Sequence, residues 1–244
     1  MSGIEGGIED SGAMDDLGAM DDWGASEDLA VVTRLVPPAG RAFADVGCGK
    51  GTLARALARL GATVLAIEPE PGQAADNAAA PEPGVRFLAG VAQALPAEDR
   101  SLDAVVFGSS LHHVPPEAMD RALAEARRVL GRPRGTLVVL EPEIACGYAW
   151  VTQPFHDETV VRRAAQAALS RAAKPWFGRR RTIAYTETYR YPDFEAFVAE
   201  IVTARYNAVP RARVATAEVE ARFNETRVAA GFALEHRMRA DVFD

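Results

Sequence analysis

The chain of 244 residues is poor in cysteine and has no long apolar run. Its two cysteines, Cys48 and Cys146, cannot form a disulfide framework, which argues against a small disulfide-stapled fold. No stretch approaches the roughly 18 uninterrupted apolar residues that a membrane-spanning helix needs. The first residues are acidic and lack the basic start and apolar run of a secretory signal. We therefore expect a cytoplasmic protein with no membrane partner.

Basic side chains are missing from residues 1–33, which contain nine Asp or Glu and no Lys or Arg. The net charge of −7 therefore arises in this segment, and the remainder is close to neutral. A near-neutral body lacks the strongly basic face that general nucleic-acid binding requires, so nucleic acid is an unlikely partner. Residues 1–28 are also Gly-rich and poor in apolar residues, which predicts a disordered, acidic N-terminal arm.

The chain is organised around residues 41–60, RAFADVGCGKGTLARALARL. A short apolar run leads into a glycine-rich turn, and the residues that follow place apolar side chains at helical spacing. Glycine lets a backbone turn tightly and approach a ligand closely, and a helix that begins there presents free N–H groups. A strand, a glycine turn and a helix in this order predict a nucleotide-cofactor site.

The spacing of these glycines indicates which cofactor is bound. A dinucleotide fingerprint reads G-x-G-x-x-G, whereas this turn reads G-x-G-x-G over Gly47, Gly49 and Gly51. Asp45 stands two residues before the first glycine, where a carboxylate suits a cationic group and would repel a pyrophosphate. The pattern resembles motif I of the class I S-adenosylmethionine (SAM)-dependent methyltransferases.

Strands and helices alternate along the rest of the chain. We predict strands at 42–46, 62–67, 85–88, 101–107, 136–140, 183–191 and 232–243, with helices at 52–60, 71–80, 116–130, 157–173, 192–202 and 216–230. Successive β–α units predict a parallel sheet with helices on both faces. The predicted fold class is α/β: a Rossmann-like, doubly wound, mostly parallel seven-stranded sheet with an antiparallel last strand, in a single domain of residues 29–244.

Further segments match the same family over about residues 40–141. Glu68, followed by Pro69, ends the second strand at the position where an acid accepts hydrogen bonds from ribose hydroxyls. Residues 90–96 resemble the family's adenine-binding segment G-D-A-E-x-L-P, with Val91 and Gln93 in place of its two acids. The chain is thus similar to the small-molecule, type 11-like class I methyltransferases, which implies SAM as cofactor and S-adenosylhomocysteine as product.

This resemblance implies a complete cofactor site and a pair of reacting groups. The implied cofactor-binding residues are Asp45, Gly47, Cys48, Gly49, Gly51, Glu68, Pro69, Ala92, Gln93 and Ser109. The L-H-H-V loop places His112 and His113 at the mouth of the substrate pocket, and an imidazole can act as a base near neutral pH. Glu141, Tyr148 and His156 are further candidates. We expect no metal site.

Residues 143–182 are expected to form an insert that roofs a small-molecule substrate. This segment contains a run of basic residues with no acid between them: Arg162, Arg163, Arg171, Lys174, Arg179, Arg180 and Arg181. Such a run favours an anionic acceptor such as a carboxylate, or an RNA phosphate, or is simply a solvated helix face. The predicted function is methyl transfer from SAM to a small molecule, by O-, N- or C-methylation. The alternatives are an RNA-base methyltransferase, an NAD-binding oxidoreductase and a non-catalytic SAM-binding protein.

Overall fold

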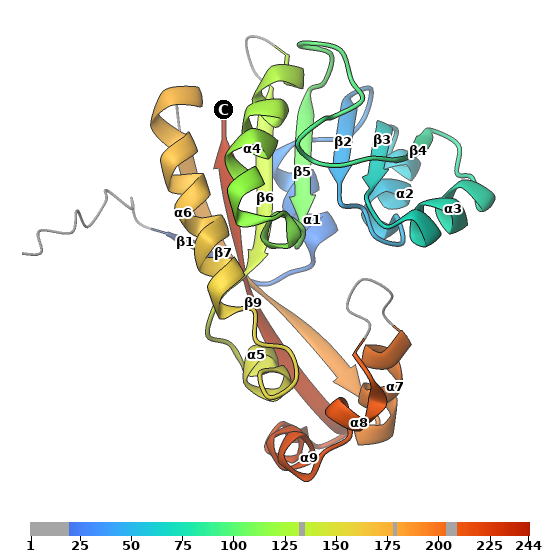
Figure 1. Cartoon of the computed structure of the whole chain (residues 1–244), viewed down its shortest axis with the longest axis vertical. Helices are drawn as coiled ribbons and strands as arrows, with labels where there is room; N and C mark the ends of the chain where they lie inside the picture. Colours follow the sequence, from blue (N-terminus) through green and yellow to red (C-terminus); the bar gives the residue numbers. More distant parts are fainter. Residues whose placement is uncertain (1–19, 132–134, 178–179, 204–208) are drawn as a thin grey trace, which may run out of the picture.

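The computed structural model describes residues 20–131, 135–177, 180–203 and 209–244. One sheet runs through them in the order β1-β7-β9-β6-β5-β2-β3-β4, with the short β8 paired to β9 (Figure 1). The strands are β1 (Asp21–Ala25), β2 (Ala42–Val46), β3 (Thr63–Glu68), β4 (Val85–Ala89), β5 (Ala104–Gly108), β6 (Thr136–Pro142), β7 (Arg180–Tyr191), β8 (Arg227–Val228) and β9 (Gly231–Phe243).

Helices cover both faces of this sheet. They are α1 (Asp28–Leu35), α2 (Thr52–Arg59), α3 (Pro71–Ala79), α4 (Met119–Val129), α5 (Gly147–Thr152), α6 (Thr159–Trp176), α7 (Phe194–Thr203), α8 (Arg211–Val214) and α9 (Ala217–Asn224), with 3-10 turns at Leu111–His113 and Pro116–Ala118. The predicted α/β, Rossmann-like class is confirmed. Strand β9 runs antiparallel to β6 and β7, as predicted for the last strand, while β2 to β6 pair in parallel.

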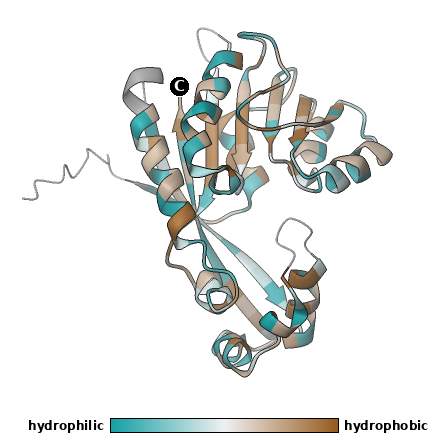
Figure 2. Ribbon diagram, in the orientation of Figure 1, coloured by the Kyte–Doolittle hydropathy of each residue, from teal (hydrophilic) through white to brown (hydrophobic). Residues whose placement is uncertain are grey.

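The central strands are apolar because both of their faces are covered. Residues 104–107 of β5 and 137–140 of β6 are all buried, as expected for parallel strands between two helical layers. One core lies under α4 and α6 and the other under α1 and α2. The brown ribbons of the central strands in Figure 2 show this concentration of apolar residues. The resulting scaffold holds the carboxyl ends of β2, β3 and β5 at one edge of the sheet.

The described sheet has two more strands than predicted. Part of the predicted N-terminal arm forms β1, which pairs in parallel with β7, and Arg237 binds Asp22 at 2.7 Å. Trp23 packs under the guanidinium of Arg34, 3.8 Å from the ring centre. The remainder of the arm, residues 1–19, lies outside the described residues. The described part of this acidic segment is therefore held by two arginine contacts, one with Asp22 and one with Trp23.

The second additional strand corrects the predicted helix at 216–230. Helix α9 ends at Asn224, and β8 then forms a tight hairpin with the start of β9. Gly231 has φ +91°, and a Cβ there would lie 2.4 Å from the carbonyl oxygen of Tyr191. The hairpin requires glycine at this point, so apolar periodicity alone placed the helix end too late.

Strands β7 and β9 are long and extend beyond the rest of the sheet. They pair from Arg180 opposite Phe243 to Tyr191 opposite Phe232, whereas β6 reaches only Met238 of β9. The extension carries α5, α7, α8 and α9 as a separate lobe with its own apolar core (Figure 1). The insert expected to roof the substrate at 143–182 is thus only part of the structure that faces the carboxyl ends of β2, β3 and β5. The lobe on β7 and β9 supplies the rest.

Within the described part of the chain, none of the helices combines the length and the apolar character needed to cross a bilayer.

Candidate functional site

A cavity of about 840 Å³ lies between the glycine turn and the lobe carried by β7 and β9. Its lining includes the turn after β2, the ends of β3 and β5, and side chains of α5, β7 and β9. Eight of the ten predicted cofactor residues line it: Gly47, Cys48, Gly49, Glu68, Pro69, Ala92, Gln93 and Ser109. The other two, Asp45 and Gly51, lie behind this surface. Both predicted histidines, His112 and His113, also line the cavity.

The three glycines of the turn serve two different purposes. A Cβ on Gly47 would lie 2.6 Å from the Cβ of Ser110, and a Cβ on Gly51 would lie 2.5 Å from the ring of Phe87. Both residues have φ near +70°, so packing and backbone conformation each require glycine. A Cβ on Gly49 would meet no described atom within 4 Å. Gly49 therefore lets the backbone lie against open space, as a ligand cradle requires.

Glu68 is buried at the end of β3 and ties the turn to the next segment. Its Oε2 accepts a hydrogen bond from the backbone N–H of Gly49 at 2.8 Å, and its Oε1 accepts one from the N–H of Glu70 at 3.0 Å. Each carboxylate oxygen can accept a second bond. The side chain is thus fixed at the cavity wall with acceptor capacity left for ligand hydroxyls.

Asp45 lies behind the turn and is fully enclosed. Among the described residues, no donor reaches its Oδ2. Burial raises the pKa of this carboxyl to about 7, and repulsion from Glu68 adds to the effect. Asp28 of α1 lies near it, with a pKa likewise raised to about 7 by burial and by the charge of Glu187. An orphaned, buried acceptor beside the glycine turn fits a cofactor that carries a cationic group.

Other predicted cofactor residues also line the cavity wall. Ser109 follows β5 with φ +50°, a conformation that non-glycine residues rarely adopt and that is concentrated at functional sites. Ala92 and Gln93 lie on the opposite wall. Burial raises the pKa of the Cys48 thiol, so Cys48 stays protonated and contributes backbone and bulk rather than a nucleophile.

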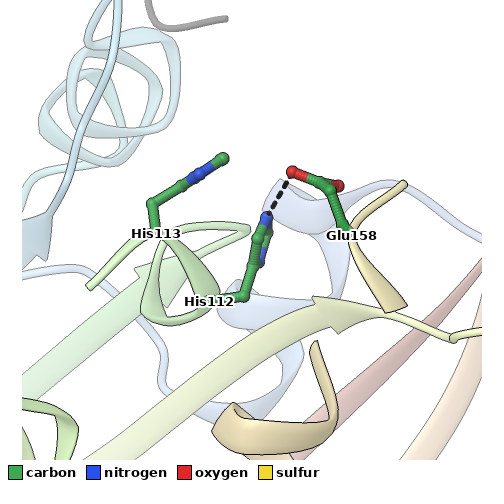
Figure 3. Close-up of side chains that lie close together, drawn as sticks. All are labelled: His112, His113 and Glu158. Atoms are coloured by element: carbon green, nitrogen blue, oxygen red, sulfur yellow. Dashed lines mark ion pairs between the residues drawn. The ribbon is translucent and has the colours of Figure 1, made fainter. Parts of the chain in front are cut away.

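His112 is buried between two carboxylates. Its Nδ1 contacts Glu141, and its Nε2 lies 3.4 Å from Oε1 of Glu158 (Figure 3). Glu141 also accepts a hydrogen bond from the backbone N–H of Leu111 at 3.0 Å, which holds the loop. Burial alone would lower the pKa of His112, but the two carboxylates outweigh it and raise the pKa to about 9. In this arrangement His112 is already protonated at neutral pH and cannot act as a base.

His113 has a different environment from its neighbour. Its side chain is exposed to the cavity, and its ring centre lies 4.1 Å from that of His112. Packing around the loop and repulsion from protonated His112 lower the pKa of His113 to about 4, so the ring is neutral. A neutral imidazole can accept a hydrogen bond from a ligand or bind a metal through its free lone pair.

Sequence reasoning missed much of the opposite end of the cavity. Tyr189 of β7 and His236 of β9 line it and pack with Tyr148, whose ring centre is 4.7 Å from that of His236. His236 is buried, and neither ring nitrogen has a hydrogen-bond partner among the described residues. All four histidines of the chain line this one cavity. These residues lie far apart in the sequence, so motif spacing could not reveal that they line one cavity.

Three arginines of the basic run at residues 162–181 are held in ion pairs. Arg162 binds Glu158 at 2.6 Å, Arg171 binds Asp120 at 2.8 Å and Arg180 binds Asp241 at 3.0 Å. The side chain of Lys174 and all of Arg179 lie outside the described residues. Glu158 lies one helical turn before the run, and Asp120 and Asp241 come from other segments, so the absence of acids within the run was misleading. This pairing weakens both the anionic-acceptor and the RNA interpretations.

Comparison with known proteins identifies the central part of the chain. Residues 44–139 match a family model described as a methyltransferase domain. An uncharacterized methyltransferase of Mycobacterium tuberculosis is 39% identical over 103 residues, which is 42% of this chain and 40% of that protein. The matched stretch thus spans about two fifths of that relative. The ubiquinone/menaquinone biosynthesis C-methyltransferase UbiE of Rubrivivax gelatinosus is 27% identical over 181 residues, 73% of this chain and 67% of that protein.

A solved structure extends the similarity to most of the fold. The YcgJ protein of Bacillus subtilis superimposes with a TM-score of 0.62 at 16% identity, over 88% of this chain and 97% of that one. At this identity the match concerns the fold alone. Together these matches confirm the predicted resemblance of the central part of the chain to the SAM-dependent methyltransferases, a family whose cofactor is SAM. Residues 44–139 are therefore similar to a methyltransferase domain, and the fold of most of the described chain is similar to that of YcgJ.

Proposed function

We propose that this protein transfers the methyl group of SAM to a small-molecule acceptor held in the 840 Å³ cavity. The observation that carries the proposal is that the glycine turn and the histidine-lined roof share one enclosed space. Small-ligand pockets usually measure about 300–1,000 Å³. The cavity therefore suits a cofactor together with a modest acceptor, and not a folded macromolecule.

The cofactor end would bind SAM through the residues predicted from the sequence. The backbone of Gly47 to Gly51 supplies a surface without side chains, and Glu68 supplies fixed acceptor oxygens. Asp45 supplies a buried negative charge, since a cationic group nearby would favour its ionised form. When bound, SAM supplies an activated methyl group on its sulfonium. The protein's task is then to orient the acceptor and exclude water, which is worth up to roughly 7–11 kcal/mol.

The acceptor end is mainly aromatic and hydrogen-bonding. Tyr148, Phe155 and Tyr189 provide ring surfaces, and His236 provides unpaired ring nitrogens. Arg162 is already neutralised by Glu158. We therefore propose an uncharged or weakly charged aromatic acceptor in place of the carboxylate that the basic run suggested. The same pairing argues against an RNA substrate.

The histidine pair would have divided roles in this reaction. Glu141 and Glu158 fix the ring of His112, which makes it a positioning residue for the 109–113 loop. His113 presents a neutral ring to the cavity and can accept a hydrogen bond from the acceptor. This division replaces the expectation that either histidine serves equally as a base.

Calorimetric titration with S-adenosylhomocysteine, with NAD as the parallel ligand, tests the proposal. We expect micromolar binding of S-adenosylhomocysteine and none of NAD, because the turn has no dinucleotide spacing. The variants Asp45→Ala and Glu68→Ala should bind S-adenosylhomocysteine more weakly while remaining folded. Binding of NAD alone would establish the oxidoreductase alternative. Binding of S-adenosylhomocysteine without turnover of any phenol, amine or carboxylate acceptor would favour the non-catalytic alternative.

A further inference from the structure

The side chains of His112, His113 and Glu158 converge on one point of the cavity wall (Figure 3). Each offers one ligand atom, and the three atoms lie within 4.8 Å of one another. Two imidazole rings and one carboxylate are the donor set that divalent transition metals favour, whereas Mg²⁺ and Ca²⁺ prefer oxygen alone. The ion would take the place of the proton on Nε2 of His112.

The distances around Glu158 distinguish a metal site from a set of hydrogen bonds. Nε2 of His156 lies 2.8 Å from Oε1 of Glu158, the usual length of a charge-assisted hydrogen bond. Nε2 of His112 lies 3.4 Å from the same oxygen, longer than the roughly 2.7–2.9 Å that is usual for a charge-assisted hydrogen bond. Tetrahedral zinc with bonds of about 2.0–2.1 Å places its ligand atoms about 3.4 Å apart. The separation of His112 and Glu158 therefore matches two ligands of one ion.

Neighbouring groups hold these side chains as the outer shell of a metal site does. Ligating histidines usually donate their second nitrogen to a carboxylate, and ligating carboxylates are hydrogen-bonded in turn. Here Nδ1 of His112 contacts Glu141, and Oε2 of Glu158 accepts a hydrogen bond from Arg162 at 2.6 Å. Nε2 of His112 thus faces Oε1 of Glu158, which His156 also contacts.

We propose that His112, His113 and Glu158 bind a divalent transition-metal ion of the zinc type, and that the ion selects an acceptor bearing a hydroxyl group. This proposal replaces the expectation from the sequence that the protein has no metal site. A bound Zn²⁺ lowers the pKa of a coordinated oxygen, which favours a hydroxyl as the group to be methylated. This second part rests on the proposed function, whereas metal binding does not.

Titration of the metal-free, untagged full-length protein with Zn²⁺, and with Co²⁺ as the spectroscopic probe, tests the site. We expect one equivalent of either ion to bind, with the visible absorption of four-coordinate Co²⁺, and Mg²⁺ not to compete. His113→Ala and Glu158→Gln should each weaken Zn²⁺ binding by at least about 100-fold, and Glu141→Gln by about 10–100-fold. His236→Ala is the matched control, since it removes a histidine of the same cavity from outside the cluster, and it should bind Zn²⁺ as wild type does.

Failure of Zn²⁺ to bind the wild-type protein, or equal binding by His113→Ala and Glu158→Gln variants that melt as wild type does, would overturn the proposal. In that case His112 is held by ion pairs alone. Parallel titration with S-adenosylhomocysteine separates the two proposals. Binding of S-adenosylhomocysteine without Zn²⁺ leaves the methyltransferase standing, and binding of Zn²⁺ without S-adenosylhomocysteine leaves only the metal site.

Discussion

The two ends of the cavity are built in different ways. The cofactor end consists of backbone and strand-end groups from short, nearly consecutive segments, with Asp45 to Gly51 and Glu68 at its centre. The acceptor end consists of side chains from segments far apart in the chain, from His112 to His236. A site made of backbone leaves a spacing pattern in the sequence, whereas a site made of side chains from separate elements leaves none.

The largest expected effect concerns the turn. Gly51→Ala should destabilise the protein by about 2–5 kcal/mol, because the new Cβ would meet Phe87 and the residue has φ +72°. Urea unfolding measures the loss. Gly49→Ala is the matched control: it meets no described atom, so it should cost about 1–2 kcal/mol for its backbone alone yet weaken S-adenosylhomocysteine binding. Equal stability of the two variants would contradict the division of roles among the glycines.

The next effect is a dependence of stability on pH. The folded-state pKa of Asp45 is raised to about 7 from an ordinary value near 3.8, so the folded protein binds more protons in that interval. The contribution of Asp45 to stability is therefore fully present below about pH 4 and is lost as the pH rises through about 7, with a total on the order of 4 kcal/mol. Asp45→Asn cannot ionise and should flatten the curve of unfolding free energy against pH. A curve as steep as that of wild type would assign the slope to other groups, with Asp28 the first candidate.

The cofactor end can be tested without disturbing the roof. Glu68→Gln keeps the size of the side chain but removes the charge that accepts two backbone hydrogen bonds, which are worth about 1.5–3 kcal/mol each when charge-assisted. We expect affinity for S-adenosylhomocysteine to fall by about 10–100-fold in calorimetry. Exposed Glu98→Gln serves as the control. Unchanged affinity in Glu68→Gln would remove this residue from the site.

The smallest effect distinguishes the roof from the turn. His236→Phe preserves the ring packing with Tyr148 but removes both unpaired nitrogens. Once an active acceptor is found, its KM should rise by about tenfold, as expected for one hydrogen bond worth about 1.4 kcal/mol. Affinity for S-adenosylhomocysteine should not change. A loss of S-adenosylhomocysteine binding in this variant would show that the two ends do not act separately.

The sequence anticipated the regular part of the molecule accurately. Buried β-strands at residues 42–46 and 136–140 were visible as apolar runs, and the glycine spacing located the turn between β2 and α2. Local signals of this kind suffice to locate a strand or a turn, because apolar runs and glycine spacing involve neighbouring residues. The predictions that differed were β1 and β8, whose order depends on contacts with β7 and β9.

Tertiary structure decided what local pattern could not. It gave the arginines at 171 and 180 carboxylate partners from other segments, and it extended β7 and β9 into a lobe that completes the roof. It also set His112 between Glu141 and Glu158, which changes its charge and its role.

The sequence by itself thus determined the fold class and the position of the glycine turn between β2 and α2, because both follow from apolar and glycine spacing along the chain. Only the tertiary structure decided the carboxylate partners of His112 and the grouping of the four histidines, because these depend on which distant side chains share one cavity.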